Sequence, residues 1–133
     1  MADFKYLKTM IRVKDLDKSL DFYTRILGMT LLRKRDNPTR KFTNAFVGYG
    51  DEVDNSVIEL TYNWDRKENY DLGEGFGYLG IGVPNIYASC KRLEKEGVLI
   101  RRKPGPMRDS DSVIAFIEDP DGYRIELVEK KSM

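Results

Sequence analysis

The sequence contains no histidine among its 133 residues. This absence removes Ser–His and Cys–His catalysis, together with the commonest side-chain ligand of transition metals. Acid–base chemistry is therefore left to carboxylates, lysine, tyrosine or a thiol, and a bound metal would need mainly oxygen ligands.

Cysteine is nearly absent as well, since Cys90 stands alone. An internal disulfide is excluded, which favours a reducing compartment, and we expect a cytoplasmic protein. Cys90 lies in the helical stretch YASCKRLEKEG, which predicts a buried structural thiol. With no histidine beside it, activation to a thiolate is not expected.

Long apolar runs and an excess of one charge are also missing. No apolar run approaches the roughly 20 residues of a membrane helix, and the N-terminal MADFKYLK lacks the apolar stretch of a signal peptide. The 23 basic and 22 acidic residues leave a net charge of +1. We therefore expect neither a membrane nor a nucleic acid as partner. The length suits one domain, 1–133, with a core of its own.

The chain does contain an internal repeat. Ile58-Glu59-Leu60 recurs 67 residues later as Ile125-Glu126-Leu127, and Gly28 is matched by Gly97 after 69 residues. Matches in one order at nearly constant spacing predict a duplicated unit, with repeats at about 6–62 and 76–129.

Each repeat is predicted to contain a strand, a helix and three further strands. Gly28 and Gly97 follow the helical patterns and suit left-handed C-terminal caps. Two βαβββ units of this kind predict an α+β fold in which curved mixed sheets surround a cleft. The expected strands are 6–13, 29–35, 42–48, 56–62, 78–83, 98–102, 112–118 and 123–128; the expected helices begin near Asp17 and cover 86–96.

Alternation along the strands assigns side chains to two faces of each sheet. Leu7, Ile11 and Val13 form an apolar face suited to packing against a helix. The concave face is predicted to collect mainly polar residues, namely Lys8, Arg12, Glu59, Asn63, Tyr78, Arg124 and Glu126. The two mid-strand glutamates are either solvated residues of half-exposed sheets or members of a site, and the repeat symmetry favours a site.

Several stretches resemble glyoxalase I, a family of the vicinal oxygen chelate superfamily. They span nearly the whole chain in the family's order: TMIRVKDLDKSLDFYTRILGMTLL, AFVGYG, VIELTYNW, GFGYLGIGVPNIYASCKRLEKEGV and AFIEDPDGYRIELVE. The resemblance implies paired βαβββ units and isomerisation of the glutathione–methylglyoxal hemithioacetal to S-lactoylglutathione. It also implies a zinc or nickel ion, a glutamate that moves a proton between neighbouring carbons, and a site built across a homodimer interface.

Carried over by position, the resemblance places the metal ligands at Lys8, Glu59, Tyr78 and Glu126. Glu59 and Glu126 match the family, as ligands and as catalytic groups. The family has His or Gln at the position of Lys8 and His at that of Tyr78. The substrate-binding residues implied are Arg12, Asn63 and Arg102.

Two functions remain open from the sequence. One is an active glyoxalase-I-like lyase that acts on a glutathione-derived molecule. The other is a non-catalytic binding or partner subunit in which a Lys–Glu cluster replaces the metal, since a protonated lysine cannot act as a ligand.

Overall fold

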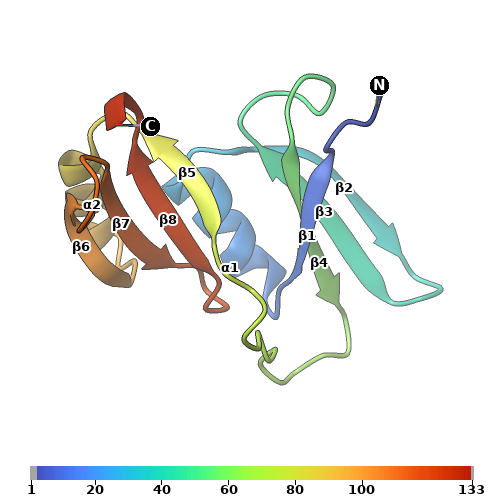
Figure 1. The fold of residues 1–133 in the computed structure, drawn as a ribbon. Helices are drawn as coiled ribbons and strands as arrows, with labels where there is room; N and C mark the ends of the chain where they lie inside the picture. Colours follow the sequence, from blue (N-terminus) through green and yellow to red (C-terminus); the bar gives the residue numbers. More distant parts are fainter. Residues whose placement is uncertain (1–2, 133) are drawn as a thin grey trace. The chain divides into compact units, whose positions relative to one another are not determined.

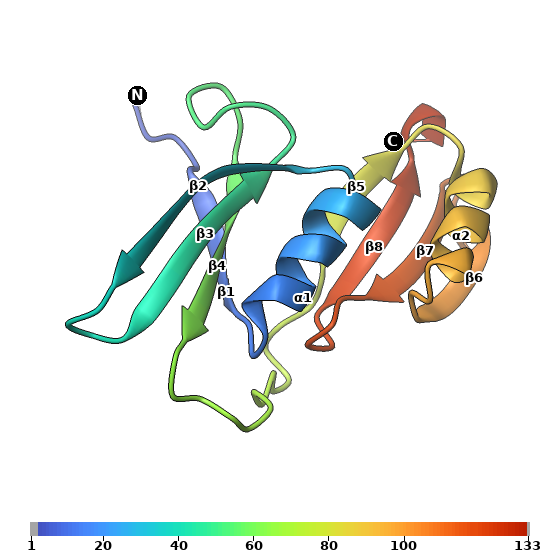
Figure 2. The same ribbon diagram turned by 180° about the vertical axis from the view of Figure 1, so that it is seen from behind.

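The computed structural model describes residues 3–132, which form two compact units. Unit 1 extends to Tyr70 and unit 2 begins at Asp71. The division falls between the two predicted repeats. Figures 1 and 2 show a four-stranded sheet in each unit, seen from two sides.

In unit 1 the strand order is β1-β4-β3-β2. Strand β1 runs parallel to β4, and the other neighbours are antiparallel. The helix packs against β4. The elements are β1 (Lys8–Arg12), α1 (Leu16–Asp21), the π-helical η1 (Phe22–Ile26), β2 (Thr30–Asn37), β3 (Phe42–Gly48) and β4 (Val57–Asn63).

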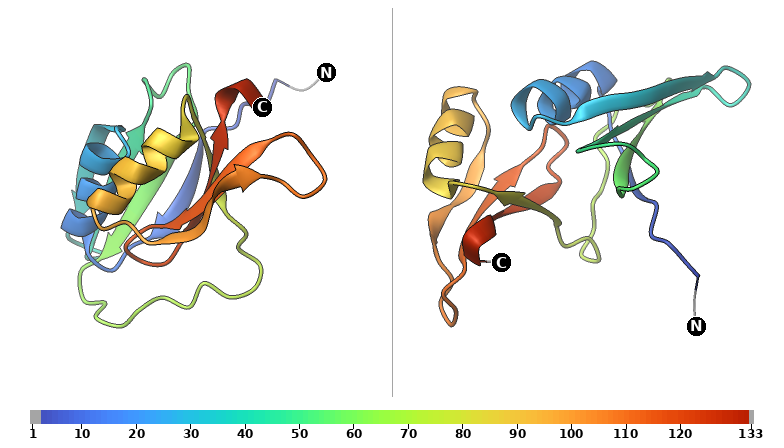
Figure 3. Two further views of the ribbon diagram at one scale, coloured as in Figure 1. Left: turned by 90° about the vertical axis from the view of Figure 1, so that its left-hand side faces the viewer. Right: turned by 90° about the horizontal axis from the view of Figure 1, so that it is seen from above.

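Unit 2 repeats this topology with the order β5-β8-β7-β6, and β5 is again parallel to β8. Helix α2 covers one face of the sheet through contacts with β6, β7 and β8 (Figure 3). The elements are β5 (Leu79–Val83), α2 (Ile86–Lys95), β6 (Ile100–Pro106), β7 (Val113–Glu118), β8 (Arg124–Glu129) and η2 (Lys130–Ser132). The predicted α+β fold of two βαβββ units is confirmed.

The two helical segments have the same kinds of N-terminal and C-terminal cap. The side chains of Asp15 and Asn85 accept hydrogen bonds from the backbone N–H groups of Lys18 and Ala88, which caps α1 and α2. Gly28 and Gly97 each have φ of 80°, the left-handed conformation expected after a helix. Within the described residues, no helix is long and apolar enough to cross a membrane.

The face that each sheet turns toward its own helix carries the core. Cys90 is buried in it, as predicted, and this burial raises the pKa of the thiol. The largest fully buried side chains are Tyr23, Leu60, Val13 and Val47 in unit 1 and Ile86, Leu93, Ile117, Ile125 and Leu127 in unit 2.

Two details of the sequence prediction are wrong. Leu7 is 59% exposed rather than part of the core, because β1 begins only at Lys8. The strand expected over 98–102 instead spans Ile100–Pro106. Its start is delayed because the backbone N–H of Val98 still bonds to the carbonyl of Leu93, which completes the turn after α2.

Two of the three buried acids have structural roles. Asp119 Oδ1 accepts the backbone N–H groups of Asp121 and Tyr123, which fixes the turn before β8. Glu129 Oε2 accepts the backbone N–H of Ile86 at the start of α2. The third buried acid, Glu59, has a different environment.

Candidate functional site

Glu59 lies in the middle of β4 and forms an ion pair with Lys8. Its register partners are Met10 on β1 and Phe46 on β3. Lys8 stands two positions before Met10, so the two charged side chains share one face of adjacent strands. Lys8 Nζ lies 2.8 Å from Glu59 Oε1, with side-chain exposures of 43% for the lysine and 11% for the glutamate. The distance is that of a charge-assisted hydrogen bond.

A second cation and an aromatic ring complete the surroundings of Glu59. The Arg33 guanidinium lies 3.7 Å from the ring centroid of Phe46, and Lys8 Nζ lies 5.2 Å from it. Arg33 also forms a 2.8 Å ion pair with Glu52. The hydrogen bond to Glu52, and to a smaller extent the charge of Glu59, raises the pKa of Arg33. We call Lys8, Arg33, Phe46 and Glu59 the Glu59 cluster.

Arg33 was missed in the sequence analysis. A bulge between Leu31 and Arg33 shifts the register, so that Arg33 comes opposite Phe46. Simple alternation takes no account of a bulge. The only signal in the sequence for this contact was an arginine in a predicted strand, next to a second predicted strand that contains a phenylalanine.

Unit 2 places Glu126 at the equivalent position. Its register partners are Gly80 on β5 and Phe116 on β7. The Tyr78 ring packs edge-to-face on Phe116, with centroids 5.3 Å apart. Tyr78 thus corresponds to Lys8 but makes an aromatic contact. Among the side chains that the structure describes, none forms an ion pair with Glu126.

Arg12 and Asn63 lie on the same face of the unit 1 sheet as the Glu59 cluster. Arg12 ends β1 opposite Thr61, and Asn63 ends β4. The side-chain amide of Asn63 donates a 3.0 Å hydrogen bond to the hydroxyl of Tyr70. Unit 1 therefore brings Lys8, Arg12, Glu59 and Asn63 onto one face, as the strand alternation predicts.

Arg102 corresponds to Arg33 in the repeat, since it follows a bulge and pairs with Phe116. Its guanidinium donates 2.9 Å hydrogen bonds to the backbone carbonyls of Ile114 and Pro106 and a 3.3 Å bond to that of Gly105. These contacts hold the end of β6 to β7. A contact with substrate, implied by the family resemblance, remains a proposal for this residue.

We therefore expect Arg102→Ala to destabilise unit 2. Hydrogen bonds from a charged donor contribute about 1.5–3 kcal/mol each, and partial exposure reduces this, so a loss of about 2 kcal/mol is expected. Arg25, in a 2.7 Å surface ion pair with Asp21, offers a control from an exposed site. Arg25→Ala should cost less than about 1 kcal/mol. Urea unfolding of both variants measures the difference, and equal losses would remove the bracing role from Arg102.

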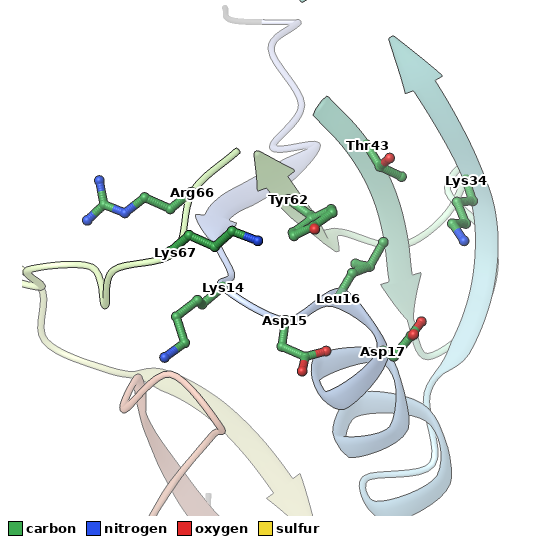
Figure 4. A pocket seen from close by; sticks show the side chains of 9 residues that line it. All are labelled: Lys14, Asp15, Leu16, Asp17, Lys34, Thr43, Tyr62, Arg66 and Lys67. Atoms are coloured by element: carbon green, nitrogen blue, oxygen red, sulfur yellow. The ribbon is translucent and has the colours of Figure 1, made fainter. Parts of the chain in front are cut away.

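A cavity of about 480 Å³ lies on the other face of the unit 1 sheet (Figure 4). Thr43 and Tyr62 line its floor, and their side chains point away from the face of Glu59. Two of its cations are already engaged: Lys14 Nζ donates to Asn69 Oδ1, and Arg66 donates to backbone carbonyls. The remaining lining residues are Asp15, Leu16, Asp17, Lys34 and Lys67. The cavity is separate from the Glu59 cluster.

The donors at the four ligand positions do not fit a zinc or nickel ion. In unit 1 the carboxylate of Glu59 is bound by an ammonium group, which has no lone pair to offer. In unit 2 Tyr78 offers a phenol hydroxyl, whereas zinc and nickel are held mainly by imidazole, thiolate or carboxylate groups. Among the described residues, no three His, Cys, Asp or Glu side chains are grouped so that they could hold a metal. Zinc and nickel sites normally include imidazole or thiolate ligands.

Two mixed sheets of one topology, each with a glutamate at the same register position, define a fold of the glyoxalase or vicinal oxygen chelate type. The chain belongs to the Glyoxalase/Bleomycin resistance protein/Dioxygenase superfamily, whose family model matches residues 5–127. The predicted resemblance is thereby confirmed.

Individual relatives are similar over nearly the full length. The lactoylglutathione lyase of Neisseria meningitidis serogroup B is 53% identical over 128 residues, which cover 96% of this chain and 92% of that protein. The trypanothione-dependent glyoxalase I of Leishmania major has a TM-score of 0.88 at 42% identity, with 98% and 90% covered. Glyoxalase I of Zea mays has a TM-score of 0.90 at 44% identity; it matches 95% of this chain, which spans 44% of the maize chain.

Proposed function

We propose that this chain is a glyoxalase-I-type lyase that acts on the hemithioacetal of glutathione and methylglyoxal. The observation that carries the proposal is the 53% identity to a lactoylglutathione lyase over 96% of the chain. The two register-equivalent glutamates, Glu59 and Glu126, support it, because they supply the carboxylates that the reaction needs.

The reaction is an isomerisation that moves one proton between neighbouring carbons and one between their oxygens, so atoms balance without any further reactant. A carboxylate takes the proton from the carbon that bears sulfur, and negative charge develops on the adjacent oxygen. The proton is then delivered to the neighbouring carbon, and the hydroxyl proton of the first carbon passes to the other oxygen, which gives the thioester of a hydroxy acid. In unit 1, Glu59 offers the carboxylate and Lys8, 2.8 Å away, offers a positive charge for the developing oxyanion.

Formation of S-lactoylglutathione from mixed glutathione and methylglyoxal, followed by thioester absorbance, tests this function. We expect turnover that is lost in Glu59→Gln and in Glu126→Gln. The Lys8–Glu59 ion pair favours a second candidate, a binding subunit without turnover. Calorimetric binding of S-lactoylglutathione with no thioester formation would support that candidate and reject the lyase.

Arg12 is proposed to hold a carboxylate of the glutathione portion. It is exposed at the end of β1, on the face of the Glu59 cluster. A guanidinium binds a carboxylate through two charge-assisted hydrogen bonds, so Arg12→Ala should weaken binding of S-lactoylglutathione by about tenfold or more. Arg25→Ala is the control, because Arg25 pairs with Asp21 on the helical side of unit 1. Equal affinities of the parent and Arg12→Ala in calorimetry would remove Arg12 from the site.

We also propose a homodimer, which the family resemblance supports, and a cytoplasmic location, which the single unpaired Cys90 supports. Light scattering of the purified chain at micromolar concentration should give twice the mass of 15.4 kDa. A monodisperse monomer would contradict the dimer.

A further inference from the structure

We propose that the Lys8 ammonium takes the place of a divalent metal at Glu59, so that this chain keeps its fold and binds its ligand without a metal ion. The identity of that ligand, a glutathione thioester or hemithioacetal, rests on the proposed function. The ion pair itself rests on the geometry of unit 1.

The first argument is the match between burial and charge. Only 11% of the Glu59 side chain is exposed, and a carboxylate in such a place is costly unless a partner neutralises it. Lys8 provides that partner at hydrogen-bond distance. The Phe46 ring, 5.2 Å from the ammonium, adds a favourable cation–π contact. The guanidinium of Arg33 on β2, two strands away from β4, adds a second positive charge that attracts the carboxylate of Glu59.

The second argument is steric and electrostatic. A zinc ion would approach the same carboxylate oxygen to about 2.0–2.2 Å. The ammonium already lies 2.8 Å from that oxygen, so an ion bound to the same oxygen would need Lys8 to move away. An ion on that oxygen would bring two positive charges close to the ammonium of Lys8 and to the guanidinium of Arg33, which repel it. The cluster therefore disfavours a divalent cation and favours the ammonium.

The third argument concerns what the ammonium still offers. It has three N–H donors, of which Glu59 accepts one. The Lys8 side chain is 43% exposed, so further donors are accessible from the open side. They suit a carbonyl or developing oxyanion of a bound thioester. A single charge polarises such an oxygen less than a divalent ion does, so slow proton transfer is expected.

The experiment has a metal arm and a ligand arm. In the metal arm, the parent without ligand is dialysed against Zn²⁺ or Ni²⁺, and the bound metal is counted. We expect none at stoichiometric level, whereas Lys8→Gln should gain affinity. Stoichiometric binding by the parent would overturn the proposal, whatever the ligand arm gives.

In the ligand arm, binding of S-lactoylglutathione is measured by calorimetry with a chelator and again with added Zn²⁺. We expect equal affinities for the parent, a loss of about tenfold in Lys8→Met, and retention in Lys8→Arg. Lys34→Met, on the opposite face of the sheet, should bind like the parent. Dependence of the parent on Zn²⁺, or an unchanged affinity of Lys8→Met, would overturn the proposal. If the parent binds neither the ligand nor a metal, the proposed function is rejected, while the replacement of the metal by Lys8 at Glu59 is supported.

Discussion

Replacing Lys8 by glutamine and Tyr78 by histidine should increase the affinity for Zn²⁺ or Ni²⁺ by about a hundredfold or more. In unit 1 the change removes the ammonium that lies 2.8 Å from Glu59 and offers an amide oxygen in its place. In unit 2 it supplies the imidazole that the chain lacks altogether. Loss of mere outer-shell partners changes metal affinity by about 10–100-fold, so regained ligands should have at least that effect.

The single variants separate the two contributions. Lys8→Gln alone removes the ammonium that repels a metal cation from Glu59, and Tyr78→His alone adds a ligand in unit 2. Each single variant should gain less metal affinity than the double variant. Lys34→Gln removes one charge on the other face of the sheet and is the matched control. Lyase activity should rise together with metal content. Metal affinity of the double variant equal to that of Lys34→Gln would show that the two positions are not ligand positions.

Truncation of the core leucine beside each glutamate should lower stability more than any other change considered above. Leu60 is 0% exposed and Leu127 is 1% exposed, and each directly follows the glutamate of its repeat. Leu→Ala at such sites leaves a cavity and costs about 2–5 kcal/mol. We expect about 3 kcal/mol for either variant, measured by urea unfolding.

Leu31→Ala provides the control for these truncations, because Leu31 is exposed on β2 and should cost less than about 1 kcal/mol. We propose that residues 1–133 unfold as a single domain, so both core variants should shift one common transition. Two transitions, each shifted by only one of the variants, would contradict the single domain. A loss at Leu60 no greater than that at Leu31 would contradict the assigned core.

The regular parts of this fold were accessible from the sequence because they follow local rules. Period-two alternation identified β3 with its observed bounds, 42–48, and the other strands within a few residues. Gly28 and Gly97 marked the helix ends, since few other residues adopt a φ of 80°. The repeat of Ile-Glu-Leu gave the equivalence of β4 and β8 directly.

The irregular parts were not accessible, because they depend on pairing between distant strands. The bulge that brings Arg33 opposite Phe46 leaves no mark in the spacing of apolar residues. The π-helical turn η1 continues α1 through a bond from the backbone N–H of Leu27 to the carbonyl of Phe22, which helical periodicity does not distinguish. The guanidinium of Arg102 braces β6, a role that depends on the register shift between Arg102 and Gly105.

The candidate site was predicted in part. Strand alternation placed Lys8 and Glu59 on one face, and the structure joins them in an ion pair. The family resemblance alone assigned a metal to these positions. The sequence shows that a lysine, Lys8, occupies a ligand position. Its 2.8 Å contact with Glu59 could be found only from the register between β1 and β4.

The most direct measurement is the metal content of the unmodified protein, purified, dialysed against excess Zn²⁺ or Ni²⁺ and then freed of loosely bound ions. An ammonium at Glu59 predicts far less than one bound ion per chain, with slow formation of S-lactoylglutathione that does not depend on added metal. One tightly bound ion per chain or per pair of chains, with efficient turnover that a chelator abolishes, would contradict the replacement of the metal by Lys8.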